Sequence, residues 1–122
     1  MAQAVAKHIK VFTMLETQFI PAADPTSRRL VIVMHGLGDS LDSFRTLPHE
    51  IGLPSLNYLL VNARTRYGPG FSWFDFPGDP GPGADQSYLQ LQQLLDGQRA
   101  NGFPTEQTVL FGFSQGCLMV WE

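Results

Sequence analysis

The chain has 122 residues, of which 43% are hydrophobic and 16% charged, a balance typical of a globular domain and not of a disordered segment. Its net charge of −3, with Arg28-Arg29 as the only adjacent basic pair, argues against nucleic acid as the main partner. A single cysteine excludes an intramolecular disulfide, and the three scattered histidines lack the spacing of a zinc site. No apolar run is long enough to span a membrane. We therefore expect one cytoplasmic domain without cofactor or metal.

Two strands are expected in the first third of the chain. The first is 9–15, where apolar and polar residues alternate loosely, and turn residues follow at 21–27. The second is 30–34, whose continuous apolar run is typical of a strand buried on both faces. We expect these two strands to form an antiparallel edge of the sheet.

A glycine-rich loop, His35-Gly36-Leu37-Gly38-Asp39-Ser40, directly follows the second strand. Such a loop lets backbone N–H groups turn inward, as one donor of an oxyanion hole requires. A short helix is expected at 42–50, with Asp39 or Ser40 as its N-cap and with Pro48 and Gly52 limiting its end. The next buried strand is expected at 58–62.

A segment rich in glycine and proline, 64–84, is too long to be a simple connection. Its aromatic residues have two interpretations: they fill the side of the core, or they line an acyl pocket. These residues are Tyr67, Phe71, Trp73, Phe74 and Phe76. Ordinary packing is the preferred interpretation for Phe76.

A helix is expected after this loop, capped by Asp85, with apolar residues at three- and four-residue steps until Gly102. The chain then turns into an apolar strand at 108–113. Because a strand–helix–strand crossover normally joins parallel strands, we expect this strand to be parallel to its neighbours.

The end of this strand carries Gly112-Phe113-Ser114-Gln115-Gly116, which is followed by a helix-like segment at 117–122. A serine on a tight turn between a strand and a helix has strained backbone angles, so small residues must lie two positions on either side. Ser114 would point off the end of the sheet, with the Gln115 amide aimed at a developing oxyanion. Taken alone, the motif is also consistent with an incidental glycine-flanked turn.

Three motifs together resemble the small serine carboxylesterases, acyl-protein thioesterases and lysophospholipases of the α/β-hydrolase family. They are His35-Gly36-Leu37-Gly38-Asp39, Ser72-Trp73-Phe74-Asp75 and Gly112-Phe113-Ser114-Gln115-Gly116. The resemblance implies a three-layer α/β/α fold with a mostly parallel sheet and a cytosolic hydrolase of carboxylic esters or thioesters.

The resemblance also implies the site residues. Ser114 is the expected nucleophile, and the amides of Leu37 and Gln115 form the expected oxyanion hole. Trp73 and Phe74 are expected to contact the substrate. In the same loop, 72–75 is expected to be fixed near the site and 78–83 to be mobile. His35, Gly36 and Gly38 are expected to support the loop, so His35 is not expected to act as the base.

The sequence departs from this family in two respects. Cys117 stands where such enzymes commonly carry another glycine, and a small thiol should need only a local adjustment. More seriously, the triad acid and histidine follow the serine in this fold, whereas eight residues follow Ser114 here. His8 and His49 are expected to be surface or partly buried residues. We therefore interpret 1–122 as the N-terminal portion of a single hydrolase domain, ending after the tight strand-to-helix turn that carries Ser114, which is called the nucleophile elbow.

A second hypothesis follows from these missing residues. The polypeptide would be a non-catalytic fragment, or a subunit that needs a partner. Its last strand would then leave a bare edge, through which the chain could self-associate.

Overall fold

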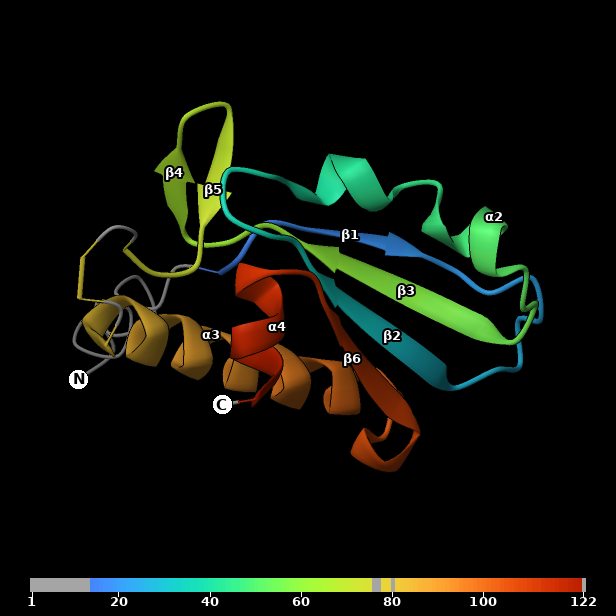
Figure 1. The fold of residues 1–122 in the computed structure, drawn as a ribbon. Coiled ribbons are helices and arrows are strands. Elements are labelled where there is room, and N and C mark those ends of the chain that lie inside the picture. The colour runs from blue at the N-terminus through green and yellow to red at the C-terminus, as the bar shows by residue number, and fades with distance from the viewer. Residues whose placement is uncertain (1–13, 76–77, 80, 122) are drawn as a thin grey trace, which may run out of the picture.

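A mixed four-stranded sheet lies at the centre of the computed structural model, which describes residues 14–75, 78–79 and 81–121 (Figure 1). The strands of this sheet are Thr17–Ile20 (β1), Arg29–Met34 (β2), Leu56–Val61 (β3) and Thr108–Gly112 (β6). Their order is β1, β3, β2, β6; β2 is parallel to both β3 and β6, and β1 is antiparallel to β3. The expected mostly parallel sheet is confirmed.

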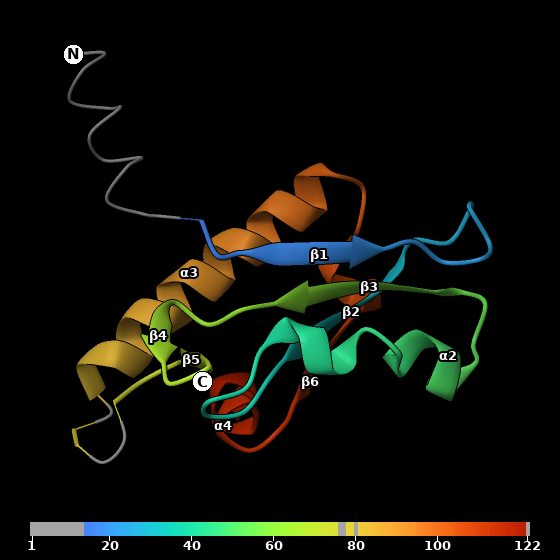
Figure 2. The same cartoon turned by 90° about the horizontal axis from the view of Figure 1, so that it is seen from above.

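Helices cover both faces of the sheet, which gives three layers (Figures 1 and 2). One face carries a 3₁₀ helix, Leu41–Phe44 (η1), and a short α-helix, Leu47–Ile51 (α2). The other face carries Gly81–Ala100 (α3) and Gln115–Trp121 (α4). The remaining elements are a hairpin, Thr65–Tyr67 (β4) with Gly70–Ser72 (β5), and a 3₁₀ turn before β6, Thr105–Gln107 (η2).

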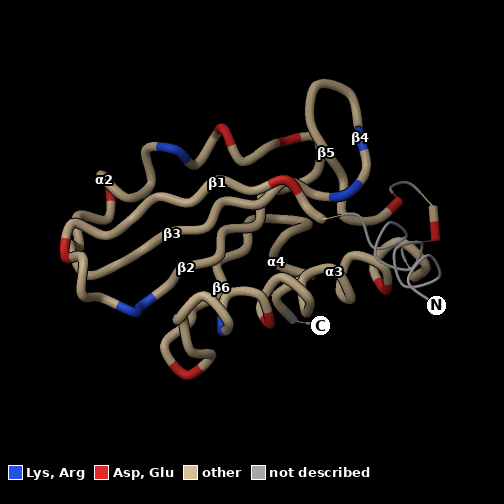
Figure 3. Tube along the Cα trace, turned by 180° about the vertical axis from the view of Figure 1, so that it is seen from behind, with Lys and Arg blue, Asp and Glu red and all other residues tan. Residues whose placement is uncertain are grey.

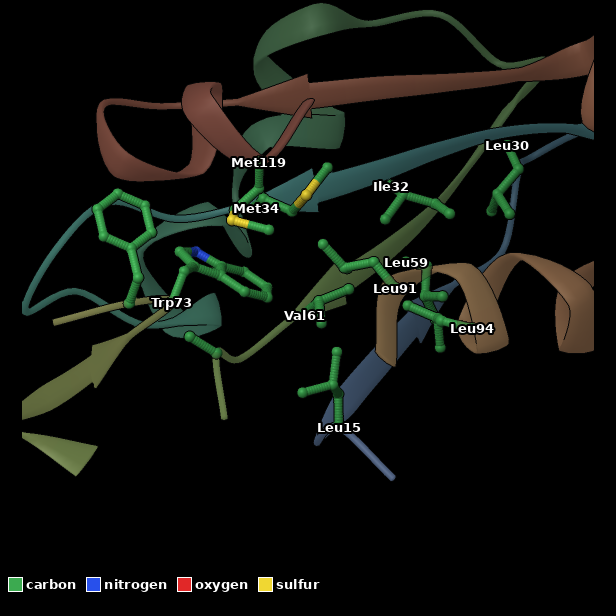
Figure 4. Close-up of a cluster of buried hydrophobic side chains, with 12 residues drawn as sticks. Leu15, Leu30, Ile32, Met34, Leu59, Val61, Trp73, Leu91, Leu94 and Met119 are labelled. Carbon is green, nitrogen blue, oxygen red and sulfur yellow. The ribbon is translucent and has the colours of Figure 1, made fainter. Parts of the chain in front are cut away.

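Side chains of β2 and β3 point alternately into two hydrophobic clusters, because successive residues of a strand face opposite sides of the sheet. The cluster under α3 and α4 contains Ile32 and Met34, together with Leu91 and Met119 from the helices (Figure 4). The opposite cluster lies against η1 and α2. It contains Val31, Val33, Leu41, Tyr58 and Leu60. Both faces of β2 are thus buried, as its continuous apolar run predicted.

The parallel strands β2, β3 and β6 all end at the same edge of the sheet (Figures 1 and 2). The loop after β2, the β4–β5 hairpin and the start of α4 meet there. Segments far apart in sequence are consequently brought together at one end of the molecule, and α2 lies at the other end.

The first strand is shorter and lies later than expected. Residues 9–13 are outside the described part, Leu15 precedes β1, and β1 pairs with β3 instead of β2. The expectation of an antiparallel edge is correct, but the expected partner is wrong. Because β2 already pairs with β3 and β6 on its two sides, it has no free edge for β1.

Two helix predictions need correction. The helix expected at 42–50 is two short helices, and Pro48 lies in the first turn of α2 instead of ending a helix. Ser40 does cap η1, and Gly52, with φ of 71°, ends α2. The long helix α3 begins at Gly81, so Asp85 lies inside it and is not its cap. Residues 81–83 are therefore helical and not the loop that we expected.

Charged residues are dispersed along the described trace (Figure 3). The arginines are separated from one another, apart from the Arg28-Arg29 pair and from Arg64 and Arg66, which are two positions apart. Among the described helices, none combines the length and apolar character needed to cross a bilayer. Within the same residues, no three potential metal ligands are grouped together.

Candidate active site

Ser114 lies on the sharp turn between β6 and α4. Its φ of 55° makes it the only residue other than glycine with a positive φ in the described part of the chain. This left-handed conformation typically costs a non-glycine residue about 1–3 kcal/mol, so the surrounding structure must maintain it. The Ser114 side chain is exposed at the edge where the parallel strands end.

The two glycines beside Ser114 are required by close backbone contacts. A Cβ atom on Gly116 would lie 2.3 Å from the carbonyl oxygen of Met34 and 2.6 Å from that of His35. A Cβ atom on Gly112 would lie 2.5 Å from the Gly116 carbonyl oxygen. Any larger residue would therefore separate α4 from the ends of β6 and β2, which explains the Gly-x-Ser-x-Gly spacing in physical terms.

The loop after β2 packs directly against this turn. A Cβ atom on Gly36 would approach the Ser114 Cβ to 3.1 Å. The hairpin fixes the other side of the loop, since the Gly38 N–H donates to the Phe71 carbonyl and the Phe71 N–H donates to the Asp39 carbonyl, both at 2.9 Å. Gly38 has φ of 77°, a conformation that favours glycine.

Two backbone N–H groups remain available beside Ser114. Within the described residues, the N–H groups of Leu37 and Gln115 have no hydrogen-bond acceptor. Gln115 is the first residue of α4, whose N-terminal amides carry a partial positive charge. Both amides belong to residues that line the same hollow as Ser114. The structure thus brings together the predicted nucleophile and both predicted oxyanion donors.

His35 is fully buried beneath the loop. Its Nε2 accepts a hydrogen bond from the Ala63 N–H at 2.9 Å, which places the proton on Nδ1, 2.6 Å from the Gly36 carbonyl oxygen. Burial lowers the pKa of His35, so the ring is held neutral. Because both ring nitrogens are occupied, His35 holds the loop and has no nitrogen free to accept a proton from Ser114.

An open hollow of about 360 Å³ lies in front of Ser114. Leu37, Phe74 and Leu118 give it a mainly apolar lining, which Ser114 and Gln115 complete. Phe74 reaches this hollow while belonging also to the core cluster. An apolar group attached to a reacting carbonyl could therefore lie along these side chains.

Trp73 does not line the hollow. Its side chain is completely buried, and the indole N–H donates to the His35 carbonyl at 2.8 Å. The ring stacks on the imidazole of His35, with a centroid distance of 5.4 Å, and lies beside Met34 (Figure 4). Of the two interpretations of the aromatic loop, core filling describes the position of the Trp73 side chain, whereas Phe74 combines both. Contact of Trp73 with the substrate stays a prediction. Phe76 lies outside the described residues.

The Gln115 side chain has a position that the sequence did not reveal. It is buried, and its Oε1 accepts from the Trp73 N–H at 2.8 Å while its Nε2 donates to the Phe74 carbonyl at 3.0 Å. Ser87 of α3 donates to the Trp73 carbonyl at 2.5 Å. These partners are 42, 41 and 14 residues apart, and no local pattern in the sequence indicates such contacts.

No base for Ser114 is found in the described part of the chain. His49 lies on α2, at the opposite end of the sheet from the elbow (Figure 1). His8 is outside the described residues. Cys117 is exposed on α4, so the thiol is accommodated at this position.

A strained serine between a strand and a helix, above a mostly parallel sheet and beside two free amides, defines the α/β-hydrolase class. The sequence model of the phospholipase/carboxylesterase family matches residues 15–122. The chain therefore belongs to the phospholipase/carboxylesterase family of α/β-hydrolases.

Individual relatives agree with this assignment. Acyl-protein thioesterase 1 of Candida albicans is 30% identical over 116 residues, covering 80% of this chain and 50% of the relative. An uncharacterized hydrolase of Schizosaccharomyces pombe is 30% identical over 104 residues, covering 74% of this chain and 43% of the relative. The chain thus spans about half the length of these curated relatives.

Solved structures show the same fold. Esterase PE8 superposes with a TM-score of 0.79 at 26% identity, covering 89% of this chain and 56% of that structure. The Bacillus cereus carboxylesterase superposes with a TM-score of 0.74 at 17% identity, covering 93% of this chain and 55% of the other.

Proposed function

We propose that this chain supplies the nucleophile and oxyanion hole of a serine hydrolase that cleaves carboxylic esters or thioesters. The observation that carries the proposal is the strained Ser114 at the start of α4, facing an apolar hollow beside the free amides of Leu37 and Gln115. A turn without a functional role would not need the strained backbone of Ser114, nor the two closely packed glycines that allow it.

The reaction would proceed through an acyl-enzyme intermediate. A histidine supplied by sequence beyond these residues would take the Ser114 hydroxyl proton while Oγ attacks the substrate carbonyl carbon. The Leu37 and Gln115 amides would stabilise the resulting oxyanion. Collapse of the tetrahedral intermediate would expel the alcohol or thiol, protonated by the same histidine. Water would then hydrolyse the acyl ester, releasing the acid and restoring Ser114.

The lining of the hollow supports an apolar acyl group as the part of the substrate that lies next to Ser114. Relatives named as thioesterases and carboxylesterases are consistent with either leaving group. No cofactor has a role in this chemistry. The single cysteine, Cys117, places no demand for an oxidising compartment, which supports a cytoplasmic site of action.

The test is hydrolysis of p-nitrophenyl esters and acyl thioesters by the full-length enzyme carrying this sequence, compared with its Ser114→Ala variant. We expect turnover that falls by at least about 10³-fold in the variant. Ser55→Ala, at a partly buried serine away from the elbow, is the matched control. An enzyme that hydrolyses these substrates equally well after Ser114→Ala would contradict the proposal.

A second candidate function is that of a non-catalytic subunit or fragment. It is favoured by the missing base near Ser114 among the described residues and by the exposed strand β6. The reading frame beyond Glu122 distinguishes the two proposals. A continuation that encodes an aspartate and a histidine on later strands supports the hydrolase, and a stop codon supports the second candidate.

A further inference from the structure

The side chain of Gln115 connects the nucleophile turn to the wall of the hollow. Its amide group makes hydrogen bonds in both directions: Oε1 accepts from the Trp73 N–H, and Nε2 donates to the Phe74 carbonyl. Ser72 Oγ lies 3.5 Å from the same Oε1, while its hydroxyl donates a short hydrogen bond to the Phe74 carbonyl. The residue next to Ser114 therefore holds the backbone of the segment that presents Phe74 to the hollow.

Other contacts hold this segment from different directions. Ser87 of α3 binds the Trp73 carbonyl, and the Trp73 indole binds the His35 carbonyl. A Cβ atom on Gly83 would lie 3.0 Å from the Phe74 Cα, so α3 packs closely behind Phe74. These contacts fix the segment against α3 and β2, whereas the Gln115 side chain ties it to the helix that carries the turn.

We propose that the Gln115 side chain is a positioning residue that sets the distance between Ser114 and the Phe74 wall, and thereby determines which acyl chains fit the hollow. This inference rests on the proposed function and extends it. The role is separate from that of the Gln115 backbone N–H, which every side-chain variant except proline retains. A long acyl chain depends on the Phe74 wall, whereas an acetyl group contacts little beyond the carbonyl.

Two substitutions separate this role from simple packing. Gln115→Met keeps the length of the side chain but removes both the donor and the acceptor. Gln115→Glu keeps both only when its carboxyl group is protonated, because an ionised carboxylate cannot donate to the Phe74 carbonyl. Burial raises the pKa of a carboxyl group, so the protonated form is favoured at this site.

The experiment measures kcat and KM of the full-length enzyme on p-nitrophenyl octanoate and p-nitrophenyl acetate. In Gln115→Met we expect the octanoate-to-acetate ratio of kcat/KM to fall about tenfold or more, mainly through a higher KM for octanoate. Gln93→Met, at an exposed glutamine of α3, should leave this ratio at the wild-type value. A merely destabilised protein would instead lose activity equally on both substrates.

The pH profile supplies the decisive second measurement. At each pH the octanoate-to-acetate ratio of kcat/KM of Gln115→Glu is divided by the wild-type ratio. Because both esters use the same catalytic histidine, its titration cancels within each protein. We expect this quotient to be near one at low pH and to fall as the introduced carboxyl group ionises, whereas the Gln115→Met quotient should stay flat.

Each outcome bears on a distinct claim. Suppose that the wild-type enzyme hydrolyses both esters and that the octanoate-to-acetate ratio of Gln115→Met lies within twofold of the wild-type ratio. This result would overturn the positioning role and leave the hydrolase proposal intact. A pH-independent Gln115→Glu quotient would also overturn it. A wild-type enzyme that hydrolyses neither ester nor a thioester would instead overturn the proposed function.

Discussion

Ser114 occupies a conformation that its own side chain does not favour. The strain of about 1–3 kcal/mol is offset by the pairing of β6 with β2 and by the packing of Met119 from α4 into the core. Since Gly112 and Gly116 allow this close crossing, the sequence motif and the backbone strain have one cause. Residues with this kind of strain are concentrated at functional sites, which is why Ser114 is the first candidate for chemistry.

The amide of Leu37 provides a direct test of the oxyanion hole. Leu37→Pro removes the N–H, and loss of one such donor typically lowers kcat about a hundred- to a thousandfold. Leu37→Ala, which shortens the side chain but keeps the amide, is the matched control. Kinetics of the full-length enzyme check the prediction; a correctly folded Leu37→Pro enzyme with the wild-type kcat would show that this amide has no such role.

The burial of His35 predicts that the free energy of unfolding depends on pH. Its pKa is lowered in the folded state by burial, so the unfolded chain, with a histidine pKa of about 6.5, binds a proton more readily. The free energy of unfolding should therefore fall as pH decreases through about 6.5, until the folded-state pKa is reached. Its contribution is fully present above pH of about 7.5.

The measurement is urea unfolding of the full-length protein between pH 5 and pH 8, compared with His35→Gln. The variant cannot titrate at this position, so its stability should vary less over the acid half of this range. An identical pH dependence in both proteins would show that His35 is not responsible.

At the level of elements, α4 crosses closely over the ends of β2 and β6. A larger residue at this crossing should therefore destabilise the fold. Gly116→Ala introduces a Cβ atom 2.3 Å from the Met34 carbonyl, a backbone atom that cannot move aside freely. We expect a loss of roughly 1–3 kcal/mol or more in the free energy of unfolding, and loss of catalytic activity.

Gly97→Ala is the matched control for that variant. Gly97 lies inside α3, and a Cβ atom there meets nothing within 4 Å. Alanine should raise stability by up to about 1 kcal/mol, because glycine is the poorer helix former. Chemical denaturation of both proteins tests the pair. Equal changes in the free energy of unfolding for Gly116→Ala and Gly97→Ala would contradict the close packing of α4 against β2 and β6.

The elements also show what the sequence could and could not predict. β2 and the elbow were predictable because an apolar run and two spaced glycines are local signals. The partner of β1 was not, because which edge of a sheet remains free depends on all the other strands. The start of α3 was hidden because Gly81 and Pro82 resemble a loop, although proline suits the first turn of a helix. The Gln115 contacts join residues more than forty positions apart, and local patterns carry no such information.

For the whole molecule, the exposed face and edge of β6 predict association. β6 ends the sheet, and Val109 and Phe113 are 59% and 60% exposed, with Phe111 and Leu118 exposed nearby. Burying such side chains typically contributes about 1.5–3 kcal/mol each, and an unpaired edge can accept another strand.

We therefore predict that the isolated 122-residue chain is not a stable monomer in solution. Size-exclusion chromatography with light scattering at low micromolar concentration should detect self-associated species. Replacing Val109 and Phe113 by threonine should reduce this association. A monodisperse 13.5 kDa monomer with a cooperative thermal transition would contradict the prediction.

The central claim for the whole molecule is that Ser114 is the nucleophile of an ester hydrolase whose base lies beyond these residues. A fluorophosphonate probe reacts covalently with an activated serine, and mass spectrometry of the labelled peptides locates the adduct. We predict an adduct on Ser114 in the full-length enzyme, and slow or undetectable labelling of the isolated chain. An active enzyme whose adduct lies on another residue, or equally fast Ser114 labelling in both proteins, would contradict the account.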